Sequence, residues 1–330
     1  MVGEKKIRKA ILALIVFCAL LSPRPLAAQK VYRIGALVAD DQFVPAFEGF
    51  KKKMAELGYR EGKNVQYDLD NAKGDRDALQ KLAQKLVQDK PDLIVSSSTT
   101  ATGPVAKLTE GTHLPVVFLS AGNPLRFVKS YASSGNNLTG ITTSAIDLIE
   151  KRLELLKELA PGMKRVISLH NPRGENYEVE VKTVQDAAKK LGLEFVEVNA
   201  TSSDELISKA KALFTRKLGE GVIYPVDAVI NNVNAIREIT PIINRERLPS
   251  VAINIGTVEA GALSAYGADY FALGQQGAVL VHKILKGTKP ADLPIEQPSK
   301  LYLVINLKTA KAIGLKVPKE ILLRADKVIE

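Results

Sequence analysis

Residues 31–69, VYRIGALVADDQFVPAFEGFKKKMAELGYREGKNVQYDL, contain the pattern that decides the fold. The stretch begins with an apolar, β-rich run at 31–38 and ends with a second one at 65–69. Between them, apolar residues recur at spacings of three and four, which places them on one face of a helix. They are Phe47, Phe50, Met54 and Leu57. The stretch therefore predicts strand, helix and strand, the unit of parallel α/β sheets.

The same order continues along the chain and then repeats. Buried strands are predicted at residues 93–95 and 116–119, each entered from a proline. In the second half, six elements follow in the same order at an offset of about 130 residues. They begin with a strand at 166–169 and end with one at 251–253. The sequence thus predicts two doubly wound α/β lobes of similar topology, although two independent Rossmann-like domains or an enzyme with duplicated halves would give the same pattern.

Residues 1–28 have the features of a secretory signal peptide. Basic residues precede an apolar run at 10–21, and Ala27 and Ala28 offer a small-residue cleavage site. The run is shorter than the ~20 residues of a spanning helix, so an uncleaved anchor is the weaker interpretation. We therefore expect an exported protein, periplasmic or otherwise extracytoplasmic.

Cleavage after Ala28 takes five of the 46 basic and one of the 36 acidic residues, and leaves a net charge of +6. The single cysteine, Cys18, is removed as well, so no disulfide is expected in the mature chain. The basic excess is dispersed, and its densest run, Lys51-Lys52-Lys53, is interpreted as a solvated helix face. We expect no nucleic-acid partner and a monomeric protein.

Motifs of catalysis and cofactor binding are missing from the sequence. There is no nucleophile elbow, Walker loop or HExxH, and no Gly-x-Gly-x-x-Gly follows the first strand. Three scattered histidines make a metal cluster improbable. We expect no cofactor, no metal and no enzymatic activity.

In an open parallel sheet, ligands bind just beyond the C-terminal ends of the strands. Six loops of this chain qualify and are rich in Ser, Thr, Asn, Asp and Gly. They are residues 39–43, 96–101 and 120–125 in the first lobe, and 170–177, 225–229 and 254–259 in the second. Two lobes facing each other would bring these loops to one cleft.

Several stretches carry a resemblance to one family. They are FEGF at 47–50, LGYREGKNV at 57–65, LPVVF at 114–118, NPL at 123–125, GNNLTG at 135–140 and GALSAYGADY at 261–270. In this order the sequence resembles the substrate-binding proteins of ABC importers related to the tryptophan/tyrosine-binding type, which have the type I periplasmic-binding fold.

The resemblance implies an architecture and a function. Lobe one would comprise residues 29–141 plus about 268–291, and lobe two residues 142–267 plus about 292–330, joined by multiple crossovers. A small polar organic molecule, an amino acid or an aromatic compound among the candidates, would be held in the cleft and delivered to an ABC permease in the cytoplasmic membrane. Hinge closure would bring both lobes onto it.

The resemblance and the loop positions together give the candidate ligand-binding residues. In lobe one they are Asp41, Gln42, Phe43, Ser97, Ser98, Thr99, Thr100 and Asn123; in lobe two they are Asn171, Glu175, Asn176, Tyr177, Asp227, Gly256 and Thr257. Hydroxyls and backbone N–H groups at 98–100 suit a carboxylate or phosphate. Asn123 stands where the family usually has Asp, which removes a charge that could pair with a ligand's ammonium group.

Two other functions remain compatible with these residues. An exported sensor could have the same fold and dock on a receptor, and loss of ligand uptake on deletion would separate it from an importer component. An enzyme could use Asp227 and His170, and binding without turnover would exclude it.

Overall fold

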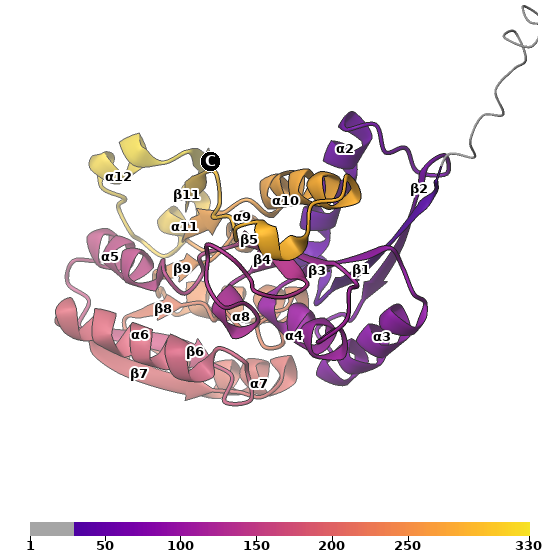
Figure 1. The fold of residues 1–330 in the computed structure, drawn as a ribbon. Helices are drawn as coiled ribbons and strands as arrows, with labels where there is room; N and C mark the ends of the chain where they lie inside the picture. Colours follow the sequence, from indigo (N-terminus) through magenta and orange to yellow (C-terminus); the bar gives the residue numbers. More distant parts are fainter. Residues whose placement is uncertain (1–29) are drawn as a thin grey trace, which may run out of the picture. The chain divides into compact units, whose positions relative to one another are not determined.

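Two β-sheets organise residues 30–330, the part of the chain that the computed structural model describes (Figure 1). The predicted signal peptide, Cys18 included, lies outside the described residues. Within them, no helix combines the length and the hydrophobicity that a bilayer crossing requires.

The first sheet is parallel throughout and has the order β2-β1-β3-β4-β5. Its strands are β1 (Tyr32–Val38), β2 (Val65–Asn71), β3 (Leu93–Ser97), β4 (Val116–Ala121) and β5 (Leu138–Thr142). The predicted strands at 31–38, 65–69, 93–95 and 116–119 are confirmed within a few residues. The interior strands are apolar because helices cover both of their faces.

The second sheet has the order β12-β11-β10-β9-β8-β6-β7. Its strands are β6 (Arg165–His170), β7 (Glu194–Asn199), β8 (Gly221–Ile223), β9 (Ser250–Ala252), β10 (Ser264–Ala268), β11 (Leu301–Asn306) and β12 (Lys327–Ile329). The run β7-β6-β8-β9-β10 repeats the strand order of the first sheet, so the predicted pair of doubly wound lobes is confirmed.

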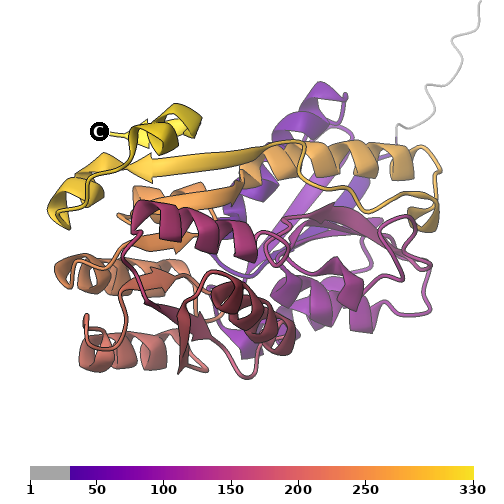
Figure 2. The ribbon, with the colours of Figure 1, turned by 90° about the vertical axis from the view of Figure 1, so that its left-hand side faces the viewer.

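Strand β11 departs from the purely parallel pattern that the sequence predicts. It pairs antiparallel with β10, and Figure 2 shows the two side by side. Between them the chain leaves for the first sheet and then re-enters the second sheet from the opposite end. Strand β12 pairs parallel with β11 and completes the edge.

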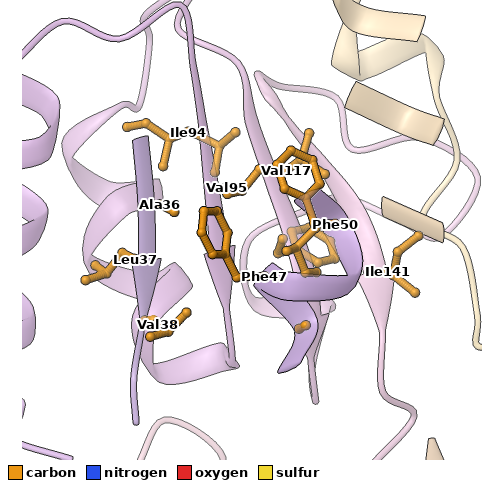
Figure 3. Packing of buried hydrophobic residues seen from close by; sticks show 14 of the residues in the cluster. Ala36, Leu37, Val38, Phe47, Phe50, Ile94, Val95, Val117 and Ile141 are labelled. Atoms are coloured by element: carbon orange, nitrogen blue, oxygen red, sulfur yellow. The ribbon is translucent and has the colours of Figure 1, made fainter. Parts of the chain in front are cut away.

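Helices cover both faces of the first sheet. Helices α2 (Val44–Glu56) and α10 (Tyr270–Leu285) pack together on one face, and α3 (Arg76–Gln88) and α4 (Thr99–Leu108) pack on the other. Figure 3 shows Phe47 and Phe50 of α2 lying over β1, β3 and β4. Burying one such ring contributes roughly 1.5–3 kcal/mol.

Helix α10 approaches α2 so closely that only glycine fits at the crossing. A Cβ atom on Gly274 would lie 1.7 Å from the carbonyl oxygen of Ala46. This contact fixes α10 on the first sheet although the strands before and after it, β10 and β11, belong to the second.

The second sheet is likewise sandwiched. Helices α5 (Ile149–Leu159) and α6 (Tyr177–Lys190) pack together, as do α7 (Ser203–Leu213) and α8 (Val233–Arg245). Shorter elements complete the fold. They are α9 (Ile255–Glu259), α11 (Leu307–Ala312), α12 (Lys319–Arg324), and the 3₁₀ turns η1 (Asp41–Phe43), η2 (Pro124–Arg126) and η3 (Pro290–Asp292).

Within residues 30–330, the chain passes between the two sheets three times. It leaves the first sheet after β5 and returns between β10 and α10. It then stays against β5 as far as Glu296, whose N–H donates to the carbonyl of Gly140 over 2.9 Å, before it enters β11. We use lobe one for the first sheet with its helices and lobe two for the second.

Candidate functional site

Loops from the two lobes enclose a small cavity between the sheets. It is lined by Phe43, Ser98, Thr99, Thr100, Ser120, Gly122, Thr143, Ala145, Asn176, Val226, Ala228, Ile253 and Tyr270. Its volume is about 20 Å³, which is about the space of one water molecule. The lining is mostly hydroxyl, amide and aromatic, with small residues where the two lobes meet.

The N-terminus of helix α4 faces this cavity. Ser98 is its N-cap, and the Ser98 hydroxyl accepts the N–H of Ala101 over 3.0 Å. The N–H groups of Thr99 and Thr100 belong to the first turn, where no intrahelical acceptor exists. Free N–H groups and the positive end of the helix dipole together favour a bound anion.

Backbone strain is concentrated at the same point. Ser98 has φ +88°, a value that L-residues rarely adopt. Its N–H donates to the hydroxyl of Ser120 over 3.2 Å, and its carbonyl accepts the hydroxyl of Thr102 over 2.7 Å. These buried bonds hold a conformation that costs of order 1–3 kcal/mol, and such strain clusters at ligand sites.

The hydroxyl of Thr99 ties two loops of lobe one together. It accepts the N–H of Gly122 over 2.9 Å and that of Asn123 over 3.2 Å. The loop after β4 is therefore held against the start of α4. Asn123 itself lines a recess at the rim rather than the cavity.

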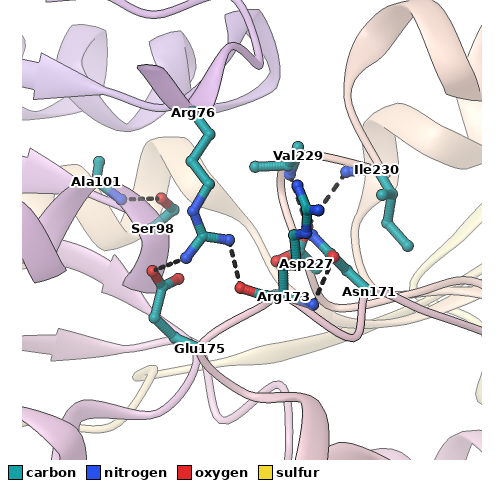
Figure 4. Close-up of polar contacts among 9 residues, drawn as sticks. All are labelled: Arg76, Ser98, Ala101, Asn171, Arg173, Glu175, Asp227, Val229 and Ile230. Carbon is teal, nitrogen blue, oxygen red and sulfur yellow. Dashed lines mark hydrogen bonds and ion pairs between the residues drawn. The ribbon is translucent and has the colours of Figure 1, made fainter. Parts of the chain in front are cut away.

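In lobe two, Asp227 organises the loops behind the cavity (Figure 4). One oxygen of its carboxylate accepts the Asn171 amide over 2.9 Å and the N–H groups of Val229 and Ile230 over 3.0 and 3.2 Å. Burial raises the pKa of Asp227, and the hydrogen bond from Asn171 acts against that rise. The chain neighbours of Asp227, Val226 and Ala228, line the cavity.

Asn176 is the one predicted residue of lobe two that lines the cavity. It is the N-cap of α6 but makes no side-chain capping bond. Its side chain is buried, and its amide oxygen has no hydrogen-bond partner. Because a buried acceptor without a donor is costly, this oxygen is suited to receive a donor from a ligand.

Two aromatic rings form another wall. Phe43 and Tyr270 stack with ring centroids 5.0 Å apart and an interplanar angle of 25°. Tyr270 begins α10, directly after the second passage between the lobes, and burial raises the pKa of its hydroxyl to about 12. An aromatic wall of this kind favours an apolar or planar group.

The other predicted site residues lie around the cavity. Gln42, Gly256 and Thr257 line a neighbouring pocket of about 670 Å³, and Tyr270 borders both. Asn123, Glu175 and Tyr177 line the rim recess, of about 530 Å³. Ser97, Asn171 and Asp227 are buried behind the cavity. Asp41 is exposed and pairs with Lys73 and Asn71 of its own lobe.

Sequence reasoning missed Thr143, Ala145, Ile253 and Tyr270. Thr143 and Ala145 follow β5, Ile253 directly follows β9, and Tyr270 opens α10. Three of these residues lie where the chain passes from one lobe to the other rather than in a strand-end loop. The repeated order of elements does not indicate that such positions line a cavity. The polar run Thr142-Thr143-Ser144 was a weak indication.

No His, Asp or Glu is among the residues that line the cavity. Among residues 30–330, no group of three or more His, Asp or Glu is placed to hold a metal ion. His170 is fully buried between the rings of Tyr177 and Phe195, with Nδ1 3.8 Å from Glu180. It does not line the cavity. The surroundings suit non-covalent binding through hydroxyl, amide and backbone groups.

Comparison with known sequences identifies similar proteins. A family model described as ABC transporter substrate binding protein matches residues 33–329. A tyrosine-binding protein of Clostridioides difficile strain R20291 is 31% identical over 290 residues, which are 87% of this chain and 81% of that protein.

Two solved structures give information on conformation as well as fold. The ABC domain from Streptococcus pneumoniae in complex with L-Trp is 26% identical, has a TM-score of 0.82, and the match covers 91% of this chain and all of that one. The ligand-free, open structure of a substrate-binding protein with adhesive properties from Clostridium difficile is 27% identical, with 91% and 99% covered, but has a TM-score of 0.65. Similar chains are thus solved both in complex with L-Trp and in a ligand-free, open form.

Proposed function

The chain belongs to the family of ABC transporter substrate-binding proteins, and we propose that it captures an aromatic amino acid, tyrosine or tryptophan, between its two lobes and delivers it to a membrane permease. One observation supports this ligand class. The N-terminus of α4, which favours an anion, and the buried, unpartnered amide oxygen of Asn176 line the same cavity.

The carboxylate of such a ligand would bind at the start of α4. The N–H groups of Thr99 and Thr100 and the nearby hydroxyls offer donors, and the helix dipole adds a favourable field. A charge-assisted hydrogen bond of this kind contributes roughly 1.5–3 kcal/mol.

The ammonium group would bind toward lobe two. The unpartnered amide oxygen of Asn176 is an acceptor on the cavity wall, and the carboxylate of Asp227 lies behind the neighbouring residues. Asp227 thereby supplies a negative charge that Asn123 lacks. A cation close to Asp227 would also offset the cost of burying that carboxylate, the cost that raises its pKa.

The side chain of the ligand would pack on Phe43 and Tyr270. A cavity of about 20 Å³ is far below the roughly 300–1,000 Å³ of pockets for drug-sized ligands. The ligand therefore enters only when the lobes separate. We propose that the three passages between the sheets act as the hinge, so that the lobes open to admit the ligand and close on it.

Export belongs to the same proposal. Residues 1–28 would direct the chain out of the cytoplasm and be removed, which the N-terminal sequence of the secreted protein would test. A deletion strain would lose uptake of the ligand if the protein supplies a permease, and would keep uptake if the protein served a receptor.

Calorimetric titration with L-amino acids tests the ligand class. We expect L-tyrosine or L-tryptophan to bind with a 1:1 stoichiometry and to be recovered unchanged. Tyramine, which lacks the carboxylate, and N-acetyl-L-tyrosine, which lacks the ammonium charge, should each bind at least tenfold more weakly. Equal binding of tyramine and tyrosine would contradict the role given to α4.

A further inference from the structure

In the described part of the chain, side chains of lobe one that do not line the cavity form hydrogen bonds with lobe two. Arg76, the first residue of α3, places its guanidinium against Glu175 and the carbonyl of Arg173, as Figure 4 shows. Asp40 and Gln42, which follow β1, make the other contacts. None of the three lines the cavity.

Asp40 acts as a cap for a helix of the opposite lobe. Its carboxylate accepts the N–H of Val233, the first residue of α8, over 3.0 Å. That N–H belongs to the first helical turn and has no intrahelical acceptor. The side-chain oxygen of Asn232, the N-cap of α8, accepts the N–H of Ala235 instead. The Asp40 side chain is only 4% exposed, and its charge lies at the positive end of the α8 dipole.

Gln42 makes a second contact beside the first. Its amide donates to the carbonyl of Asn231 and accepts from the side chain of Asn254 over 3.3 Å. Both partners belong to lobe two. The turn η1 after β1 thus contacts both the loop before α8 and the loop after β9.

Arg76 makes the third contact at a different edge of the cleft. One nitrogen of its guanidinium lies 3.0 Å from Glu175, and a second donates to the carbonyl of Arg173. The Glu175 side chain is 19% exposed. Burial raises the pKa of Glu175, and the charge of Arg76 acts against that rise. Arg76 therefore favours the ionised form of Glu175, the form with which it pairs.

We propose that Asp40 and Arg76 form a latch that holds the lobes closed and thereby sets ligand affinity without touching the ligand. All of these bonds join the two lobes, so they are broken when the lobes separate. A contact present only in the closed state stabilises that state whether or not the ligand is bound. Ligand bound in the cleft escapes when the lobes open, so a weaker latch raises the dissociation rate and leaves association unchanged.

Four variants test the latch, two in it and two as matched controls. Asp40→Ala removes the carboxylate that accepts the N–H of Val233, and Arg76→Gln removes the guanidinium. Asp75→Ala removes a capping carboxylate that accepts the N–H groups of Asp77 and Ala78 within lobe one. Lys85→Gln removes a charge of the same helix as Arg76, and Lys85 pairs with Asp70 and Asp89 of lobe one.

The first readout is the rate of dissociation of L-tyrosine or L-tryptophan in stopped flow. Because one charged hydrogen bond is worth roughly a tenfold change in an equilibrium constant, each latch variant should release the ligand about five- to tenfold faster. Association rates should change less than twofold, and both controls should behave as the parent. Latch variants with parental dissociation rates would overturn the proposal.

The second readout needs no ligand, so it separates this inference from the proposed function on which the first readout rests. Fluorescent labels on the two lobes report the closed fraction of the unliganded protein by single-molecule energy transfer. We expect that fraction to fall about five- to tenfold in the latch variants and to stay parental in the controls. An equal closed fraction in all five proteins would contradict the latch, even if no amino acid bound.

Discussion

The side-chain amide of Asn171 donates to one carboxylate oxygen of Asp227 over 2.9 Å, with both side chains buried. Asn171 directly follows β6, and Asp227 follows β8. The bond therefore joins two strand-end loops of lobe two just behind the cavity, and the same oxygen also holds the N–H groups of Val229 and Ile230.

Replacing Asp227 separates its structural role from the role of its charge. Asp227→Ala leaves three buried donors without an acceptor, so we expect the free energy of unfolding to fall by about 3 kcal/mol. Asp227→Asn keeps an acceptor oxygen and should fold with nearly parental stability. It should bind L-tyrosine about tenfold more weakly, because the ligand's ammonium loses a charged neighbour. Chemical denaturation and calorimetry measure both; parental affinity in Asp227→Asn would contradict the electrostatic role.

Thr99 makes a similar link in lobe one. Thr99→Val keeps the shape of the side chain but leaves the N–H groups of Gly122 and Asn123 without their acceptor. We expect a loss of about 2 kcal/mol in unfolding free energy, with weaker ligand binding because the loop after β4 loosens. Thr99→Ser, which restores the hydroxyl, is the control. If Val and Ser at this position were equally stable, the hydroxyl would have no linking role.

Arg152 is a fully buried cation that connects two passages between the lobes. Its guanidinium donates to the carbonyls of Ala145 and Tyr266 over 2.7 and 2.8 Å. Burial lowers the pKa of Arg152 to about 10, so the side chain stays protonated at neutral pH.

Arg152→Met should therefore cost about 3 kcal/mol of unfolding free energy, because two buried carbonyls lose their donor. Lys151→Met, on the exposed face of the same helix, should change stability by less than about 0.5 kcal/mol. Urea denaturation measures both. A loss below 1 kcal/mol in Arg152→Met would show that the guanidinium is dispensable.

Glu205 stabilises the folded protein over a defined pH range. Hydrogen bonds from Lys209 and from Thr201 lower its pKa to about 2, against an ordinary 4.5. Because the pKa is lower in the folded state, the stabilisation is present above pH 4.5 and is lost as the pH falls toward 2.

We therefore expect Glu205→Gln to have a slightly lower midpoint of urea denaturation than the parent at pH 7, and the difference to shrink between pH 4.5 and 2.5. The effect is small because the Glu205 side chain is 38% exposed. Asp204→Asn, at an exposed neighbouring position, is the control. A difference that grew on acidification would have the wrong sign.

Much of this architecture is encoded in local patterns. The apolar runs and the helix face from Phe47 to Leu57 predict the first β-α-β unit, and the repeated order predicts the second lobe. Strand β11 is antiparallel because the chain enters it after its third passage between the lobes. Such a passage produces no periodic pattern of apolar residues in the sequence, so the sequence did not predict it. For the same reason Thr143 and Tyr270 escaped notice as cavity residues.

The candidate site was predictable only to the level of loops. Parallel strands end at one edge of a sheet, so loops such as 96–101 and 225–229 could be expected near a ligand. The conformation of each loop decides which of its side chains faces the cavity, and the hydrophobic pattern of the sequence does not determine that conformation. Asp41 points outward to Lys73, while its neighbour Phe43 points inward to Tyr270. Arg76 was not expected because it begins a helix and follows no strand directly.

A reversible cross-link between the lobes tests the central claim, that a guest molecule enters and leaves only when the lobes separate. A Cβ atom on Gly74 of lobe one would lie 3.0 Å from the Cβ of Asn232 of lobe two. This is closer than the roughly 3.5–4.5 Å of a disulfide, and Gly74 has φ +81°, so the bond forms with a small shift of the Gly74 backbone. The chain after Ala28 has no cysteine to interfere. Gly74→Cys combined with Asn232→Cys, oxidised before L-tyrosine or L-tryptophan is added, should show no binding by calorimetry, and reduction of the same sample should restore it. Equal binding in the oxidised and reduced forms would contradict the account.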